Sequence, residues 1–278
     1  MRIDAHQHFW CYSATEYPWI GNGMERLAHD HLPADLAPLA AAEGIAGTVA
    51  VQARQSLAES RWLLELAAAD PLIRGVVGWV DLRSTHVADQ LREFAERPKF
   101  VGVRHVVQDE ADPRFLLGDS FLHGIRQLAT FGLTYDLLLY PHQLPAAVEF
   151  VGRFPEQPFV LDHLAKPRIK AGELDPWRHD LEALATHANV LCKLSGLVTE
   201  ADWHGWKRTD FTPYLEVALE AFGPQRLMIG SDWPVCTLAA EYADTVGIVR
   251  EFLAPLSEPE REAIEGGNAA RFYALDLG

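Results

Sequence analysis

The chain has 278 residues, of which 49% are hydrophobic, and its formal net charge at pH 7 is −15. This acidity argues against a nucleic-acid partner or an anionic membrane surface, because phosphate contacts need a basic patch. No apolar run reaches the ~18 residues of a membrane span. The length is close to the roughly 250 residues of a (β/α)₈ barrel, and no linker-like segment interrupts it, so we expect one domain over residues 1–278.

Eight short apolar runs alternate with longer segments of helical pattern along the chain. The expected strands are residues 2–9, 47–53, 75–82, 100–106, 134–140, 159–165, 190–196 and 226–232. Several are apolar almost throughout, which is typical of parallel strands covered on both faces. The expected helices are residues 33–44, 56–70, 85–96, 119–131, 143–153, 175–187, 212–222, 239–253 and 258–273. This α/β alternation predicts a (β/α)₈ TIM barrel. An open doubly wound sheet is the alternative, but its glycine-rich fingerprint is absent after the first strand.

Two connections that follow expected strands, residues 9–32 and 197–211, are unusually long and rich in aromatic residues. Long loops on the C-terminal rim of a barrel are often functional. Their aromatic side chains could stack on a ligand ring, or they could simply anchor the loops.

The ends of three expected strands carry residues suited to metal or acid–base chemistry. His6 and His8 lie two positions apart, so their side chains point to the same face of a strand. His163 follows an apolar run, and Asp232 ends another; a buried carboxylate needs a partner, a metal or a proton. If these ends meet on one barrel rim, they can hold a divalent metal, activate a water, or both. The alternatives are a structural histidine pair, a core histidine and a turn aspartate.

Other polar residues at strand ends are candidates for binding a ligand. Arg104 and Gln52 could contact ligand hydroxyls or a carboxylate. Internal ion pairs or hydrogen bonds within the barrel are the alternative, and we favour that alternative for Asp81 and Asp136. The predicted substrate-binding residues are Gln52, Trp79, Arg104 and His105.

The three cysteines, Cys11, Cys192 and Cys236, are widely spaced and form no Cys-x-x-Cys motif. This pattern suits neither a disulfide framework nor a thiolate zinc site. With His6 and His8 so near the start, no cleavable signal peptide is expected before them. We therefore predict a cytoplasmic protein. Either a monomer or a homodimer is compatible with the sequence.

Six motifs together carry a resemblance to a known family. They are Asp4-Ala-His-Gln-His-Phe-Trp10, Tyr17-Pro-Trp-Ile20, Leu32-Pro-Ala-Asp-Leu36, Asp162-His-Leu-Ala-Lys-Pro167, Lys193-Leu-Ser-Gly196 and Gly230-Ser-Asp-Trp-Pro234. The chain resembles the amidohydrolase superfamily over nearly its whole length. Within that superfamily it is most similar to sugar-lactone hydrolases of the L-fuconolactonase and L-rhamnonolactonase type. The resemblance implies a (β/α)₈ barrel with its site at the C-terminal ends of the strands.

The resemblance also implies roles for particular residues. His6 and His8 match the first-strand histidine pair, His163 matches the sixth-strand histidine, and Asp232 matches the eighth-strand aspartate, the expected general base. Binuclear members carry a bridging lysine or glutamate on strand four and a histidine on strand five, whereas this chain has Arg104 and Asp136 there. We therefore expect one Zn²⁺ or other divalent metal on His6, His8 and Asp232, with His163 as a potential fourth ligand, or no metal requirement at all.

These expectations predict a lactonase that opens an aldonolactone, such as L-fuconolactone, to the free acid. Asp232 would activate the attacking water, and His163 would assist in catalysis. The alternatives are a metal-dependent decarboxylase of the same superfamily, for which Arg54 and Arg104 could capture a carboxylate, and a pyrone-dicarboxylate-type lactonase. A sugar-binding barrel without catalytic activity is a further competitor.

Overall fold

The computed structural model describes residues 1–278 and contains one parallel sheet in which eight strands follow each other in chain order. The strands are β1 (Arg2–Gln7), β2 (Ile45–Val51), β3 (Ile73–Gly78), β4 (Phe100–His105), β5 (Thr134–Leu137), β6 (Phe159–Leu161), β7 (Val190–Leu194) and β8 (Leu227–Ile229). Each of them lies within or overlaps a predicted strand. The observed strands end earlier, because the last residues of each predicted run leave the sheet and enter the loops of the C-terminal rim.

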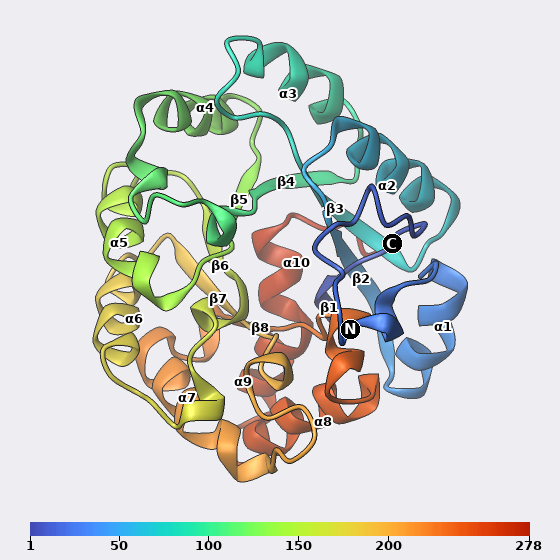
Figure 1. The fold of residues 1–278 in the computed structure, drawn as a ribbon, viewed down its shortest axis with the longest axis vertical. Helices are drawn as coiled ribbons and strands as arrows, with labels where there is room; N and C mark the ends of the chain where they lie inside the picture. The colour runs from blue at the N-terminus through green and yellow to red at the C-terminus, as the bar shows by residue number, and fades with distance from the viewer.

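The principal helices lie between the strands and surround them as an outer ring (Figure 1). They are α1 (Pro33–Ala42), α2 (Leu57–Ala69), α3 (Val87–Ala95), α4 (Asp119–Thr130), α5 (Leu144–Gly152), α6 (Trp177–Ala185), α7 (Arg208–Phe222) and α8 (Tyr242–Leu253), followed by α9 (Glu258–Glu262) and α10 (Asn268–Phe272). The inner faces of the ring helices and the outer faces of the strands form the larger hydrophobic core, which includes Leu63, Ile125 and Phe150.

Hydrogen bonds between the first and last strands close the barrel just beyond the end of β8. The His8 amide donates to the carbonyl of Trp233 at 2.7 Å, and the Asp232 amide donates to the carbonyl of His6 at 2.8 Å. The predicted (β/α)₈ barrel is confirmed, and the open-sheet alternative is wrong. Closure also brings the C-terminal end of β1 directly beside the segment that follows β8.

The opposite end of the barrel is sealed by the C-terminal segment. Ala269, Tyr273 and Leu275 pack against apolar residues inside the barrel, among them Ile3 and Val49. Figure 1 shows α10 near the centre of the ring of strands. Because this end is filled by the chain itself, a ligand has access only from the C-terminal rim.

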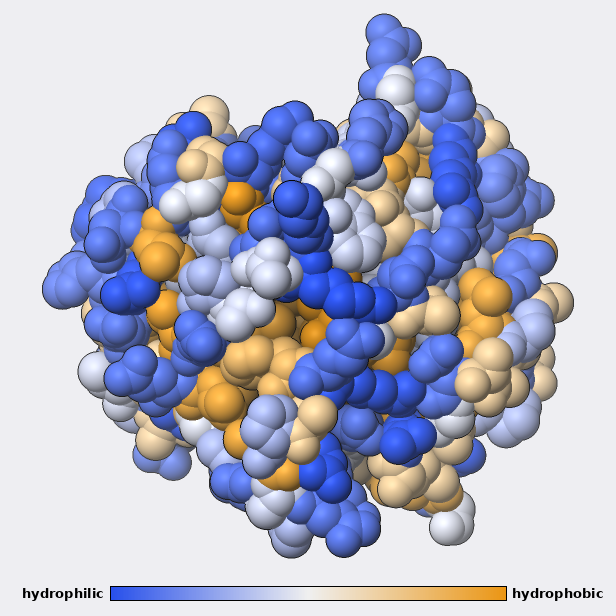
Figure 2. Space-filling view, turned by 90° about the horizontal axis from the view of Figure 1, so that it is seen from below, coloured by the Kyte–Doolittle hydropathy of each residue, from blue (hydrophilic) through white to orange (hydrophobic).

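The surface is predominantly polar on the face shown in Figure 2, where hydrophobic residues are interspersed among hydrophilic ones. No helix combines the length and the apolar character that crossing a bilayer would require.

Candidate active site

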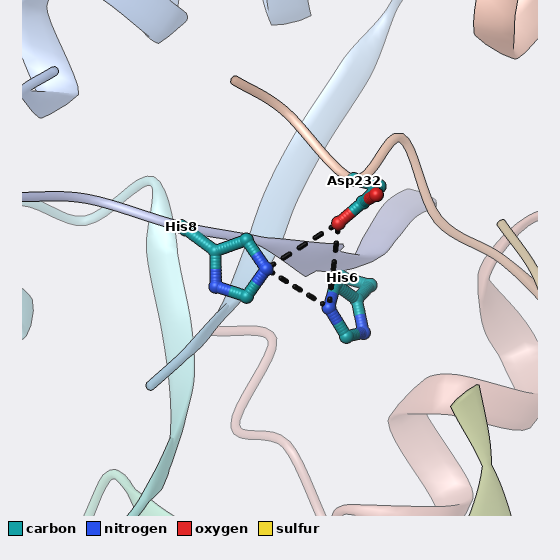
Figure 3. A group of neighbouring side chains, drawn as sticks. All are labelled: His6, His8 and Asp232. Carbon is teal, nitrogen blue, oxygen red and sulfur yellow. Dashed lines mark hydrogen bonds and ion pairs between the residues drawn. The ribbon is translucent and has the colours of Figure 1, made fainter. Parts of the chain in front are cut away.

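The imidazole of His6 on β1, the imidazole of His8 just after β1 and one carboxylate from the loop after β8 meet at the C-terminal end of the barrel (Figure 3). The Nε2 atoms of His6 and His8 lie 3.1 Å apart. Oδ1 of Asp232 lies 3.4 Å from His8 Nε2 and 3.8 Å from His6 Nε2. All three residues are buried. The predicted convergence of the chain's two ends is therefore present.

The hydrogen-bond partners of the two histidines direct lone pairs toward this meeting point. His8 Nδ1 lies 2.7 Å from the carbonyl of Val51, which can only accept, so Nδ1 carries the hydrogen and Nε2 has a free lone pair. His6 Nε2 lies 3.3 Å from a guanidinium nitrogen of Arg104, which can only donate. Two imidazole lone pairs and a carboxylate oxygen thus face one another, an arrangement that repels unless a cation or a proton lies among them. This donor set fits a single divalent metal.

His163 approaches the same carboxylate from the loop after β6. Its Nε2 lies 3.7 Å from Asp232 Oδ1, and its Nδ1 lies 2.8 Å from the hydroxyl of Ser195. His163 begins a run of four residues with left-handed backbone, φ between 52° and 56°, which ends at Lys166. Such a conformation costs roughly 1–2 kcal/mol per non-glycine residue, and strain of this kind concentrates at functional sites.

Asp232 also has a left-handed backbone, with φ of 58°. The preceding residue, Ser231, is fixed by the buried carboxylate of Asp4, which accepts from its amide at 2.9 Å and from its hydroxyl at 2.6 Å. The Tyr242 hydroxyl donates to the same carboxylate at 3.1 Å. A buried network therefore holds the turn that presents Asp232.

Burial and neighbouring charges set the protonation states at the site. Burial lowers the pKa of His6 well below its usual value, although Asp162 opposes the shift. Burial likewise lowers the pKa of His163 to about 4, with Asp232 opposing. For Asp232, burial would raise the pKa, but the neighbouring imidazoles, first of all His163, outweigh it and the pKa is lowered. At neutral pH His6 and His163 are therefore neutral and the Asp232 carboxylate is ionised.

Beneath these residues lies a fully buried network of charges. Lys193 Nζ lies 2.6 Å from Asp136 Oδ2, 3.0 Å from Asp162 Oδ1 and 3.2 Å from His6 Nδ1. Arg104 pairs with the other oxygen of Asp162 at 3.0 Å and also donates to the carbonyl of Gln52. Burial raises the pKa of Asp136 to about 6, with Lys193 opposing. The preference for an internal ion pair at Asp136 agrees with this geometry.

The site opens into a cavity of about 850 Å³ on the C-terminal rim. Its polar and aromatic lining includes His8, Arg54, Arg104, His163 and Asp232. Further contributions come from the loops after β1, β5, β6 and β7, namely Glu16, Trp19, Tyr140, Lys166, Thr199, Glu200 and Trp203. The long loops therefore do supply aromatic side chains to the cavity wall.

Of the four predicted substrate contacts, only Arg104 lines this cavity. His105 points outward from the barrel, stacks on Phe115 and hydrogen-bonds Glu110 at 2.7 Å. Its neighbour on the strand, Arg104, points inward, so the alternation of a strand explains the difference. Trp79 contacts His105 through its indole nitrogen at 3.4 Å, and Gln52 is completely buried beneath the site. These three residues lie outside the cavity lining, so this geometry does not support their assignment as substrate contacts, which stays a prediction.

Sequence reasoning did not select Lys166 or Glu200, which both line the cavity. Lys166 lies in the same motif as His163, three residues further along, and Glu200 lies in the second of the two long loops. The motif and the long loop could have been used to select these two residues from the sequence. Their side chains reach the cavity, however, only because of the conformations of the loops after β6 and β7.

Known proteins resemble this chain over its full length. An L-fucono-1,5-lactonase of Burkholderia multivorans is 46% identical over 99% of this chain and 96% of its own length. A second L-fucono-1,5-lactonase, from Burkholderia ambifaria, is 38% identical over 99% of this chain and 96% of its own. A crystal structure of a Burkholderia multivorans amidohydrolase with bound zinc superposes with a TM-score of 0.95 at 46% identity, covering 99% of this chain and 100% of that one. Residues 3–275 match the amidohydrolase family, and the chain belongs to that family.

Proposed function

We propose that the protein hydrolyses the lactone of a sugar acid, of the L-fucono-1,5-lactone type, to the free aldonic acid. The observation that carries the proposal is the convergence of His6, His8 and Asp232 at the base of a cavity large enough for one sugar ring. The two relatives named L-fucono-1,5-lactonase, at 46% and 38% identity over nearly the whole chain, support the substrate class.

In this mechanism, Asp232 accepts a proton from a water molecule that attacks the lactone carbonyl. The carboxylate is ionised at neutral pH and faces the cavity, so it can take that proton without a prior deprotonation step. Arg104 lines the cavity beside His6 and can donate a hydrogen bond toward the carbonyl oxygen as negative charge develops there. When the ring opens, the protonated Asp232 returns its proton to the departing alkoxide.

His163 approaches Asp232 from the loop after β6 and helps to position it and the attacking water. It is neutral and held by Ser195, so one ring nitrogen is fixed while Nε2 faces Asp232. His6, His8 and Asp232 would hold the metal, with His163 as a further ligand within reach. A bound Zn²⁺ would supply Lewis-acid polarisation of the carbonyl and a lower pKa for water. The zinc-containing relative supports this cofactor.

The decarboxylase alternative was based on Arg54 and Arg104 as the groups that would capture a carboxylate. Arg104 is compensated by Asp162, and Arg54 forms an ion pair with Glu16. Both arginines on which that alternative rested are therefore already paired, and the lactonase is the better supported function. The three unpaired cysteines, two of them buried, support a cytoplasmic location as part of the same proposal.

The decisive experiment is a screen of aldonolactones with a pH indicator, because each ring opening releases one proton. Every lactone should be tested with and without a chelator, followed by Zn²⁺ addition. Rapid acid release from L-fucono-1,5-lactone supports the proposal. Carbon dioxide release from aromatic acids without lactone opening would establish the decarboxylase instead, and tight sugar binding without acid release would establish a binding protein.

A further inference from the structure

Lys166 and Glu200 face the cavity as charged groups without a protein partner. Lys166 is partly buried and lies on the loop after β6, and Glu200 is partly buried on the loop after β7. Neither head group forms an ion pair or a hydrogen bond with the rest of the chain, in contrast to the compensated Arg104 and Arg54. Withdrawing a charge from water without a partner is unfavourable, so these two groups are suited to a polar ligand.

The two charges lie close enough to influence each other but not close enough to pair. Burial raises the pKa of Glu200, and the positive charge of Lys166 opposes that shift. Burial raises the pKa of Tyr140, and the negative charge of Glu200 raises it further. The Lys166 ammonium lies 5.5 Å from the centre of the Tyr140 ring. A cation and a carboxylate therefore share one wall of the cavity with an aromatic ring.

The left-handed backbone at Lys166, which places its side chain in the cavity wall, costs conformational free energy. Lys166 ends the left-handed run that begins at His163, with φ of 52°. The same run therefore directs two side chains into the cavity, of which the mechanism uses only His163. Trp203 adds a second aromatic surface next to Glu200, and its indole donates to the Thr199 carbonyl at 2.9 Å.

A vicinal pair of hydroxyl groups matches this wall. Each hydroxyl can accept from an ammonium and donate to a carboxylate, so a diol satisfies both charges at once. Aromatic rings suit the apolar face of a sugar. A substrate carboxylate at this position would be attracted by Lys166 but repelled by Glu200, so the wall favours an uncharged ring.

We propose that Lys166 and Glu200 are specificity-determining residues that bind adjacent ring hydroxyls of an uncharged, polyhydroxylated lactone. This inference rests on the proposed lactonase function and deepens it, because it states which part of the substrate the loops after β6 and β7 recognise. The two residues contact hydroxyls away from the scissile bond, so they contribute to binding more than to the chemical step.

The test compares Lys166→Met and Glu200→Gln on two substrates, L-fucono-1,5-lactone and the unsubstituted δ-valerolactone. Losing a hydrogen bond to a charged group should lower kcat/KM for the sugar lactone about tenfold to hundredfold in each variant, chiefly through KM. The value for δ-valerolactone, which has no ring hydroxyls, should change by less than about twofold. Equal losses on both lactones, or no loss on the sugar lactone, would overturn the inference.

Matched controls are Lys170→Met, an exposed lysine four residues along the same loop, and Glu216→Gln on the exposed face of α7. Both should leave the kinetics on either lactone unchanged. Thermal unfolding of all four variants identifies any that are misfolded.

A binding measurement separates this inference from the proposed function. L-fucose presents ring hydroxyls but has no bond to hydrolyse, so calorimetry can follow its binding in a protein that opens no lactone. Weaker L-fucose binding in Lys166→Met and Glu200→Gln, but not in the controls, supports the hydroxyl-binding wall even if the lactonase proposal fails. Unchanged L-fucose binding in both variants overturns it.

Discussion

His8 Nε2 lies 3.4 Å from Asp232 Oδ1, although the two residues come from opposite ends of the chain. Barrel closure produces this contact, because the amides of His8 and Asp232 donate to the carbonyls of Trp233 and His6 across the seam. The geometry of the site therefore depends on closure of the barrel. A change that opens the seam would separate the groups that the proposed reaction needs.

Asp232→Asn should abolish lactone hydrolysis while the protein stays folded. The amide cannot accept the proton of the attacking water, and loss of a general base typically costs about 10²- to 10⁴-fold in rate. The measurement is kcat for L-fucono-1,5-lactone together with the unfolding midpoint. Asp89→Asn, on the exposed surface of α3, serves as the control and should behave like the parent. Retention of substantial activity by Asp232→Asn would refute the assignment of this base.

His8→Ala should reduce the zinc content of the purified protein from about one ion per chain to near zero. His8 contributes a lone pair fixed by the Val51 carbonyl, and alanine leaves only His6 and Asp232 as close ligands. Elemental analysis after zinc loading and desalting measures the content. His204→Ala, in the exposed part of the loop before α7, is the matched control. Full zinc occupancy in His8→Ala would mean that the metal lies elsewhere.

Gly196→Ala should impair activity more than stability. A Cβ at this position would lie 2.6 Å from Cγ and Nδ1 of His163, so the ring must move away from Asp232. The left-handed φ of 64° adds about 1 kcal/mol of strain.

Gly172→Ala isolates the strain, since its φ of 67° is similar but no atom lies within 4 Å of the added Cβ. The two variants should therefore show a similar loss from backbone strain in urea unfolding, with additional loss of kcat only in Gly196→Ala. Equal kcat values for the two would argue against a role for the His163 position.

Lys193→Met should be strongly destabilising. The ammonium lies between Asp136 and Asp162 in a fully buried site, and its removal leaves two carboxylates facing each other. Breaking a buried ion pair from one side typically costs about 3 to 5 kcal/mol of unfolding free energy.

Asp136→Asn should cost less, about 1 to 2 kcal/mol, because the amide oxygen can still accept and Lys193 keeps Asp162 as a partner. Chemical denaturation of both variants measures the difference. A loss for Asp136→Asn as large as that for Lys193→Met would contradict the central position of the lysine in this network.

Because of Glu59, the free energy of unfolding should decrease as the pH rises from about 4.5 to about 7. Burial raises the pKa of this carboxyl to about 7, although amides of Arg54 and Ala53 donate to it. Its favourable contribution is fully present below the unfolded pKa of 4.5 and is lost as the pH rises through 7. The expected loss is about 3 kcal/mol, at about 1.4 kcal/mol per pH unit.

Glu59→Gln should remove this part of the pH dependence. Its amide oxygen can still accept from the backbone amides of Ala53 and Arg54, which connect the loop after β2 to α2. Urea unfolding at several pH values between 4 and 8 should give a flatter profile for Glu59→Gln than for the parent. Parallel profiles would show that the carboxyl does not titrate in this range.

Much of the fold could be predicted because local patterns report it directly. Eight apolar runs separated by helical segments specify strands covered on both sides. The helix expected from residue 56 begins where the Ser56 hydroxyl accepts from the amides of Ala58 and Glu59. Strand ends were predicted too late, for example in the run 159–165, where β6 ends at Leu161 and residues 163–166 have left-handed backbone instead. No local sequence pattern predicts four consecutive non-glycine residues with left-handed backbone, because only the surrounding structure stabilises that conformation.

Strand periodicity and the ends of parallel strands follow from local chemistry, so the sequence could predict the barrel and could select His6, His8, His163 and Asp232 as candidate site residues. The three-dimensional packing was needed to show which further side chains line the cavity. It turned His105 outward, used Asp162 and Lys193 as buried support, and brought Lys166 and Glu200 to one wall. Those outcomes depend on loop conformation and on charge pairing between distant strands, which no short stretch of sequence encodes.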